Sequence, residues 1–347
     1  MATILYLGDS HPSSTSAHRA RALERLGHTV NVCDLNKVIA QSKGFRYLEP
    51  LHYRTGYRFL QPQVTRLVKH LVATTPRPDV VWVNSGELVG PRSLELLKQL
   101  GCPLVLYNND DPTGGRDGRR FDTLLKSLSY YDLCAVMREI NVPEFRAKGA
   151  KNVIHVRMSY DEVVHQPFTH ASDIPAIYKS EVVFIGTWMR YEKRDEFLLA
   201  LLEQGIPLTI WGSRWSKSPH WAALQAVHKG DALSGRDYVA AIQGAKICLG
   251  LLSKGNRDEH TQRSQEVPFA GGLLCAERTA EHQEMYEEGV EAAFWADAAE
   301  CAQVCKKLLQ DDDAREKMRL AGMQRVRAMQ AGNEDVCRRI LNTIHIY

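Results

Sequence analysis

The chain has 347 residues, of which 44% are hydrophobic and 24% charged, and its formal net charge is +3. These values are typical of a globular protein with two domains, and a dedicated nucleic-acid binder is usually more basic. No apolar run reaches the roughly 18 residues that a membrane-spanning helix needs. The N-terminus has no basic segment before its apolar residues, so we do not expect a secretory signal.

Cysteine usage indicates a reducing compartment. The eight cysteines form no Cys-x-x-Cys pair, and most of them lie in apolar runs. We therefore expect reduced core thiols in a cytoplasmic protein. Cys301 and Cys305 share one helix face, but no nearby His pattern completes a zinc site, and no metal site is predicted.

The first half of the chain alternates short apolar strands with helical stretches. This alternation is typical of a parallel sheet that is covered by helices on both faces. We expect strands at residues 4–7, 29–33, 80–83, 104–107, 133–136 and 153–155. The helices between them are expected at residues 17–26, 63–73, 92–100, 121–128 and 142–148.

The alternation stops at residues 161–180, where Asp161, Pro167, Asp173 and Pro175 indicate a linker. A second alternating set follows. Its strands are expected at residues 182–185, 208–211, 247–250, 273–276 and 291–295. Its helices are expected at residues 195–203, 235–243, 263–270, 281–288, 298–309 and 313–329, and an amphipathic tail helix at 334–345.

The predicted fold class is α/β, with two Rossmann-like doubly wound domains that face each other across a cleft. The first domain is expected to comprise residues 1–165 and the second residues 177–330. The tail carries Val336, Ile340 and Ile344 on one helix face, so we expect residues 333–347 to pack back on the first domain. Ligands of such sheets bind at the carboxyl ends of the strands.

The segment from Arg263 to Ala276 is the most informative motif. It reads as a short helix, a Gly-Gly break and a buried strand. Arg263 and Glu266 are three residues apart and therefore lie on one helix face. A cation suits phosphate oxygens and a carboxylate suits two ribose hydroxyls, although the same pair also fits a surface ion pair before a helix end.

Several motifs occur in a fixed order around this segment. They are Phe184-Ile185-Gly186-Thr187, then Lys193-Arg194 before Phe197, then Gly212-Ser213-Arg214-Trp215, and finally Arg263 with Glu266. In this order they resemble the donor domain of GT-B glycosyltransferases of the glycosyl transferase group 1-like kind, specifically the spore-maturation (CgeB-like) group. The resemblance covers residues 180–330 well and the first half more loosely.

The resemblance implies a donor site in the second domain. Gly186 and Thr187 would approach the diphosphate of a nucleotide sugar, beside Gly212 and Ser213 of the next strand end. Lys193 or Arg194 would add positive charge there, Arg263 would bind phosphate oxygens, and Glu266 would bind ribose. Many retaining GT-B enzymes carry a second glutamate eight residues earlier, where this chain has Asp258.

The first domain is then expected to bind the acceptor. Asp9 follows the first strand, and Asp110 and Asp111 follow the fourth, so all three lie at strand ends. Each is a candidate catalytic base, and the adjacent pair should raise one another's pKa. An Asp pair also suits a metal or a simple Asp-Pro turn. The basic loop at residues 114–120 could contact an anionic acceptor or simply be solvated.

The sequence thus predicts a metal-independent glycosyltransferase that uses a nucleoside-diphosphate sugar, with UDP favoured by family frequency, and no further cofactor. The acceptor is open among a glycan, a protein, a small molecule and a modified nucleic-acid base. The alternatives are another two-domain sugar-nucleotide enzyme, such as an epimerase, and a non-catalytic protein that binds a sugar or a nucleotide.

Overall fold

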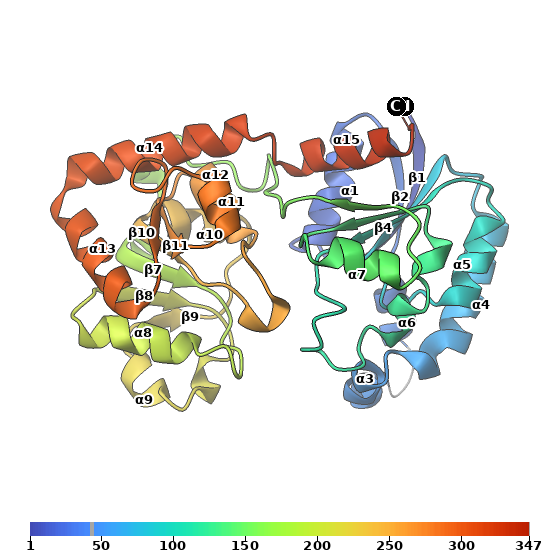
Figure 1. Ribbon diagram of the computed structural model, residues 1–347, viewed down its shortest axis with the longest axis horizontal. Coiled ribbons are helices and arrows are strands. Elements are labelled where there is room, and N and C mark those ends of the chain that lie inside the picture. Colours follow the sequence, from blue (N-terminus) through green and yellow to red (C-terminus); the bar gives the residue numbers. More distant parts are fainter. Residues whose placement is uncertain (42–44, 347) are drawn as a thin grey trace. The chain divides into compact units, whose positions relative to one another are not determined.

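The computed structural model describes residues 1–41 and 45–346 (Figure 1). The chain divides into two compact units, which we call unit 1 (Met1–Arg157 with Asn333–Tyr347) and unit 2 (Met158–Gly332). Each unit contains one six-stranded parallel sheet. Both sheets are flanked by helices, which confirms the predicted class of two Rossmann-like domains. None of the described helices has the length and apolar character needed to cross a membrane.

The sheet of unit 1 has the strand order β2-β1-β3-β4-β5-β6, and every pair of neighbours is parallel. The central strands are buried, and the edge strand β2 is half exposed. Its strands are β1 (Thr3–Leu7), β2 (Thr29–Cys33), β3 (Val80–Asn84), β4 (Leu104–Asn108), β5 (Leu133–Val136) and β6 (Val153–His155). Its helices are α1 (Thr15–Arg25), α2 (Leu35–Ala40), α3 (Phe45–Arg54), α4 (Gln61–Thr74), α5 (Pro91–Lys98), α6 (Asp122–Leu125) and α7 (Asn141–Ala147).

The C-terminal helix α15 (Asn333–Thr343) belongs to unit 1. It lies beside α1, so the two ends of the chain pack together (Figure 1). Val336, Ile340 and Leu341 are buried, because their spacing places them on one helix face. At the start of α15, Glu334 accepts a hydrogen bond of 2.5 Å from the Arg25 guanidinium of α1.

The sheet of unit 2 has the order β12-β11-β10-β7-β8-β9, again with parallel neighbours. The strands β7 and β10 therefore lie at its centre. Its strands are β7 (Ser180–Ile185), β8 (Leu208–Trp211), β9 (His228–Gly230), β10 (Ala245–Gly250), β11 (Leu274–Glu277) and β12 (Ala293–Trp295). Its helices are α8 (Arg194–Glu203), α9 (Trp221–Leu224), α10 (Gly235–Gln243), α11 (Arg263–Phe269), α12 (Ala280–Met285), α13 (Ala298–Gln310) and α14 (Asp312–Ala328).

Residues 158–165 group with unit 2 and not with the first domain, where the sequence prediction put them. Specific contacts explain this difference. The Met158 N–H donates a 3.0 Å hydrogen bond to His260 Nε2. The ring of Tyr160 stacks on Phe269 with 3.9 Å between centroids. The expected linker is thus ordered against unit 2, and it contains two short 3-10 turns, Ala171–Asp173 and Ala176–Tyr178.

Several short elements differ from the sequence prediction. Strand β9 was missed because its three residues are polar or glycine and only half buried. Helices α2 and α3 were also missed. The expected helix at 121–128 is a single turn, α6, followed by a 3-10 turn at Leu128–Tyr130.

The side chain of His282 is buried in unit 2, at the start of α12. Its Nδ1 lies 2.7 Å from the carbonyl of Glu277, so this nitrogen carries the proton and donates. Its Nε2 then accepts from the Ser264 hydroxyl, 2.7 Å away. Burial disfavours the charged ring and lowers the pKa of His282 from 6.5 to about 4.

The packing of α15 on α1 predicts a large effect of Ile340→Ala. Because Ile340 is fully buried, the substitution leaves a cavity and should lower the free energy of unfolding by about 2–5 kcal/mol. Asn342→Ala on the exposed face of the same helix should change it by less than about 0.5 kcal/mol. Urea unfolding followed by circular dichroism measures both, and equal effects would refute this packing.

The neutral state of His282 predicts a pH dependence of stability. Between pH 4 and 6.5 the unfolded ring is protonated while the folded ring is not, so the stability is complete above pH 6.5 and declines as the pH falls. The loss should approach about 3 kcal/mol. The amide of His282→Gln can bind both Ser264 and the Glu277 carbonyl but does not titrate. This variant should therefore lose less stability at low pH than the wild type. Urea unfolding at about pH 7.5 and about pH 4.5 compares the two proteins. If the wild type and His282→Gln lose the same stability between these two pH values, His282 is not neutral in the folded protein.

Candidate functional site

Three loops of unit 2 follow the carboxyl ends of neighbouring strands. They comprise residues 186–193 after β7, residues 212–220 after β8 and residues 251–262 after β10. Because the strands are parallel and adjacent, the loops emerge at one edge of the sheet. Most residues of the predicted donor site lie in them.

The backbones of Gly186 and Gly212 approach each other closely. A Cβ atom on Gly212 would lie 2.0 Å from the carbonyl oxygen of Gly186, and the φ angle of Gly212 is +148°. The indole of Trp215 donates to the same Gly186 oxygen at 2.8 Å. Next to this contact, the Trp188 N–H donates to the Ser213 carbonyl at 3.0 Å. The structure therefore brings the predicted residues of the first two loops together.

Arg194 connects the first loop to the third. One guanidinium nitrogen donates to the carbonyl of Thr187 at 3.1 Å, and the other to the carbonyl of Leu252 at 3.3 Å. These bonds direct the charged group at backbone oxygens of the protein. We therefore read Arg194 as a residue that positions the loops.

Glu192 makes a second connection between the same loops. Its carboxylate accepts from the Ser253 hydroxyl at 2.9 Å and from the Lys254 N–H at 2.8 Å. Sequence reasoning missed this residue, since a single Glu in a polar loop carries no signal of its own.

The buried carboxylate of Asp195 connects the first loop to the second. It accepts from the Trp188 indole at 2.9 Å and from the Ser218 hydroxyl at 2.6 Å. Burial acts to raise the pKa of Asp195, but these hydrogen bonds outweigh it and hold the pKa below its ordinary value. Asp195 is therefore a stable anion that fixes both loops.

A pocket of about 660 Å³ opens between these two loops. Four cations and two carboxylates line it. One cation, Lys193, lies 3.9 Å from Glu196. Among the described residues, no carboxylate lies within 4 Å of the other three cations. The pocket therefore has a surplus of positive charge that suits an anionic ligand. Its lining consists of Trp188, Met189, Arg190, Tyr191, Lys193, Asp195, Glu196, Arg214, Lys217 and Pro219.

The backbone of these loops is locally strained. Tyr191, Lys193, Arg214 and Arg257 have φ angles of 72°, 53°, 67° and 52°. A non-glycine residue in this left-handed region costs about 1–2 kcal/mol. Such residues persist only where the surrounding contacts fix them, and they cluster at functional sites.

The carboxylate of Glu266 is buried among residues of unit 2. The residue is 7% exposed, and its Oε2 accepts a 2.6 Å hydrogen bond from the Tyr238 hydroxyl of α10. Its Oε1 lies 3.7 Å from Nε2 of His165. Burial and the Glu266 charge raise the pKa of Tyr238 well above its ordinary value, so the phenol stays protonated and donates.

Arg263 lies on the first turn of α11 and is half buried. Its Nε is buried and has no hydrogen-bond partner in the described part of the chain. Asp258 is 9% exposed, and its N–H donates to the carbonyl of Ser253 at 3.3 Å. It therefore belongs to the same loop that Glu192 holds.

The three predicted aspartates of unit 1 differ in their surroundings. Asp9 is exposed and accepts from the N–H of His11 at 2.8 Å. Asp111 is buried and accepts from the Asn141 side chain at 2.8 Å, at the start of α7. Burial raises the pKa of Asp110, although Arg120, at 3.6 Å, opposes the shift. The charge of Asp117 adds to this increase.

Two arginines of the basic loop of unit 1 are paired with carboxylates. Arg119 donates to Asp122 at 2.8 Å. Arg120 donates to Glu87 at 2.7 Å, and Asp117 also lies 3.3 Å from it. Sequence reasoning missed Glu87, whose pKa is raised by burial in spite of Arg120.

Comparison with known proteins identifies the fold. Residues 192–339 match the family model described as glycosyl transferase-like, and no curated protein sequence matches the chain. Sucrose-phosphate synthase from Thermosynechococcus elongatus has a similar structure, with a TM-score of 0.72 and 14% identity over 99% of this chain and 98% of that one. Alr3699/HepE of Anabaena, solved with UDP and glucose, gives 0.71 and 14% over 99% of both chains.

A protein from Listeria monocytogenes, named as a candidate UDP-N-acetylglucosamine 2-epimerase, also has a similar structure. Its TM-score is 0.62 at 14% identity, over 99% of this chain and 95% of that one. Likeness at such low identity establishes the fold. The chain therefore has the GT-B fold of two Rossmann-like domains, and the match of residues 192–339 to the glycosyl transferase-like model lies mostly in unit 2.

Proposed function

We propose that the protein is a glycosyltransferase that transfers a sugar from a nucleoside-diphosphate sugar, preferably a UDP-sugar, to an acceptor. The observation that carries this proposal is the cationic pocket at the ends of β7 and β8. Arg190, Arg214 and Lys217 line it without a carboxylate within 4 Å in the described part of the chain. A diphosphate is the anion that a nucleotide sugar offers at such strand ends.

In this proposal the pocket stabilises the leaving nucleoside diphosphate. Negative charge develops on the diphosphate as its bond to the sugar breaks, and preorganised cations lower the energy of that transition state. Arg190, Lys193, Arg214 and Lys217 supply the charge, which makes a divalent metal unnecessary. The buried Nε of Arg263 offers a further donor. Arg194 takes a positioning role in place of the phosphate contact that the sequence suggested.

The remaining donor contacts are assigned to the third loop and α11. Glu266 is proposed to bind ribose hydroxyls, with its carboxylate oriented by Tyr238. Asp258 is proposed to bind a hydroxyl of the transferred sugar. The Gly186 and Gly212 contact and its neighbours Thr187 and Ser213 are proposed to shape the backbone next to the diphosphate.

The acceptor is proposed to bind unit 1 at the carboxyl ends of β1 and β4. Among the three aspartates, Asp110 is the best candidate base, since a raised pKa makes a carboxylate a stronger proton acceptor. Asp9 is a candidate for binding the acceptor, because its side chain is exposed. Asp111 is used in holding α7. The free thiols of the chain agree with the proposed cytoplasmic location.

A second candidate function is that of an epimerase acting on a nucleotide sugar, which the similarity to the Listeria protein favours. Product analysis separates the two. A transferase releases UDP and forms a new glycosidic bond, whereas an epimerase returns an isomeric UDP-sugar. Binding of UDP without any turnover would indicate a non-catalytic nucleotide-binding protein.

The cationic pocket predicts that Arg190→Ala weakens UDP binding. Loss of a charge-assisted contact of about 1.5–3 kcal/mol corresponds to about a 10- to 150-fold higher Kd. Calorimetric titration with EDTA present measures this and tests metal independence at the same time. Arg338→Ala, an exposed arginine on α15, is the matched control. Equal Kd values for both variants, or no UDP binding by the wild type without metal, would contradict the proposal.

The ribose contact predicts a selective effect of Glu266→Gln. The amide keeps the volume and still accepts from Tyr238, so the fold should persist. Its single neutral oxygen should weaken UDP binding by about 10-fold or more, while binding of 2′,3′-dideoxy-UDP should match the wild type. Tyr238→Phe removes only the hydroxyl that orients the carboxylate, so it should weaken UDP binding less than Glu266→Gln does and leave binding of 2′,3′-dideoxy-UDP unchanged. A loss of the same size for both ligands would mean that Glu266 does not contact ribose.

A further inference from the structure

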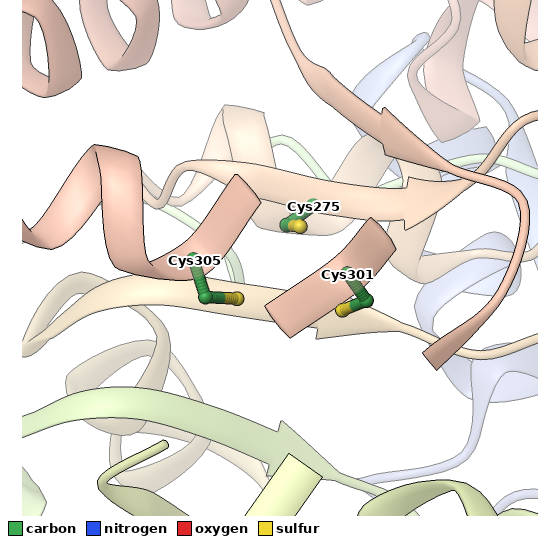
Figure 2. Close-up of side chains that lie close together, drawn as sticks. All are labelled: Cys275, Cys301 and Cys305. Atoms are coloured by element: carbon green, nitrogen blue, oxygen red, sulfur yellow. The ribbon is translucent and has the colours of Figure 1, made fainter. Parts of the chain in front are cut away.

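Three cysteine side chains meet in the core of unit 2. Cys275 lies on β11, and Cys301 and Cys305 lie on α13 (Figure 2). Their Sγ atoms all lie within 4.8 Å of one another. Sequence reasoning saw only the two helix residues. The proximity of Cys275 to this pair could not be predicted, because it depends on how α13 packs on the sheet.

The secondary structure explains why the three thiols converge. Cys301 and Cys305 are four residues apart and therefore lie on one face of α13. Cys275 pairs with Leu249 across the β10–β11 ladder, and both point into the same apolar core of unit 2. All three cysteines are fully buried.

The donor set has a clear chemical preference. Three sulfur atoms form a soft ligand set that selects thiophilic ions over magnesium or calcium. No fourth His, Cys, Asp or Glu of the described residues joins the group. Structural zinc is almost always bound by four ligands, so zinc fits the group poorly. An ion that is satisfied by three sulfurs fits it well.

We propose that Cys275, Cys301 and Cys305 form a binding site for a soft, three-coordinate ion, of which Cu(I) and As(III) are the two examples. Arsenous acid would react with the three thiols to give a neutral tris-thiolate and three water molecules. Cu(I) would displace one thiol proton if the complex is to stay neutral. A neutral complex is favoured in either case, because an uncompensated charge in an apolar core is costly.

Binding would join α13 to β11 by bonds that do not depend on packing alone. The site is separate from the cationic pocket, since the two share no residue. The proposal therefore stands independently of the proposed glycosyltransferase activity.

The test uses the reduced full-length chain under nitrogen. It is titrated with arsenite and, separately, with Cu(I) delivered from a competing chelator. We expect one ion per chain, a higher midpoint of thermal unfolding, and three sulfur neighbours by X-ray absorption. Binding of only one of the two ions would support the site and identify its ion.

Single substitutions then locate the site. Cys275→Ala, Cys301→Ala and Cys305→Ala should each weaken binding by about 100-fold or more, since loss of an outer-shell partner alone costs about 10–100-fold. Cys248→Ala is the matched control, because Cys248 is buried on the adjacent strand and packs in a different cluster. The proposal is overturned if the wild type binds neither ion, if it shows only two sulfur neighbours, or if the control loses binding equally. The first two of these outcomes are measured on the wild type, so they do not depend on whether a variant folds.

Discussion

The candidate site depends on one steric constraint, the close approach of the Gly186 and Gly212 backbones. Any side chain on Gly212 would collide with the Gly186 carbonyl, so the ends of β7 and β8 can meet only where this position is glycine. The indole of Trp215 then binds the same carbonyl, and Asp195 joins the two loops a few residues later. The shape of the cationic pocket follows from these contacts.

Much of the fold could be predicted from the sequence because its strands are buried and parallel. Such strands read as short apolar runs between helices, and all six strands of unit 1 were found in this way. Strand β9 could not be predicted in this way. His228–Gly230 has no apolar run and is held only by pairing with β8, so nothing local distinguishes it from a loop. The position of residues 158–165 likewise depends on distant partners, such as His260 and Phe269.

The candidate site was predictable to a smaller extent. Motifs identified the strand-end glycines and the pair Arg263 and Glu266, because their spacing is local. The role of each charged side chain could not be predicted, because it depends on contacts with residues far away in the chain. The sequence indicated Arg194 and not Arg190 as a phosphate contact, yet Arg194 binds two backbone carbonyls and Arg190 lines the pocket. The burial of Glu266 depends on Tyr238 and His165, which precede it in the chain by 28 and 101 residues.

The left-handed residues of the three loops have a consequence for binding. Tyr191, Lys193, Arg214 and Arg257 adopt a backbone shape that an isolated peptide would rarely populate. Folding of unit 2 has therefore already fixed this shape and met its energetic cost. An incoming ligand does not have to order the loops, so less of its interaction energy is lost to conformational entropy. The strain within the free protein thus favours affinity in the complex.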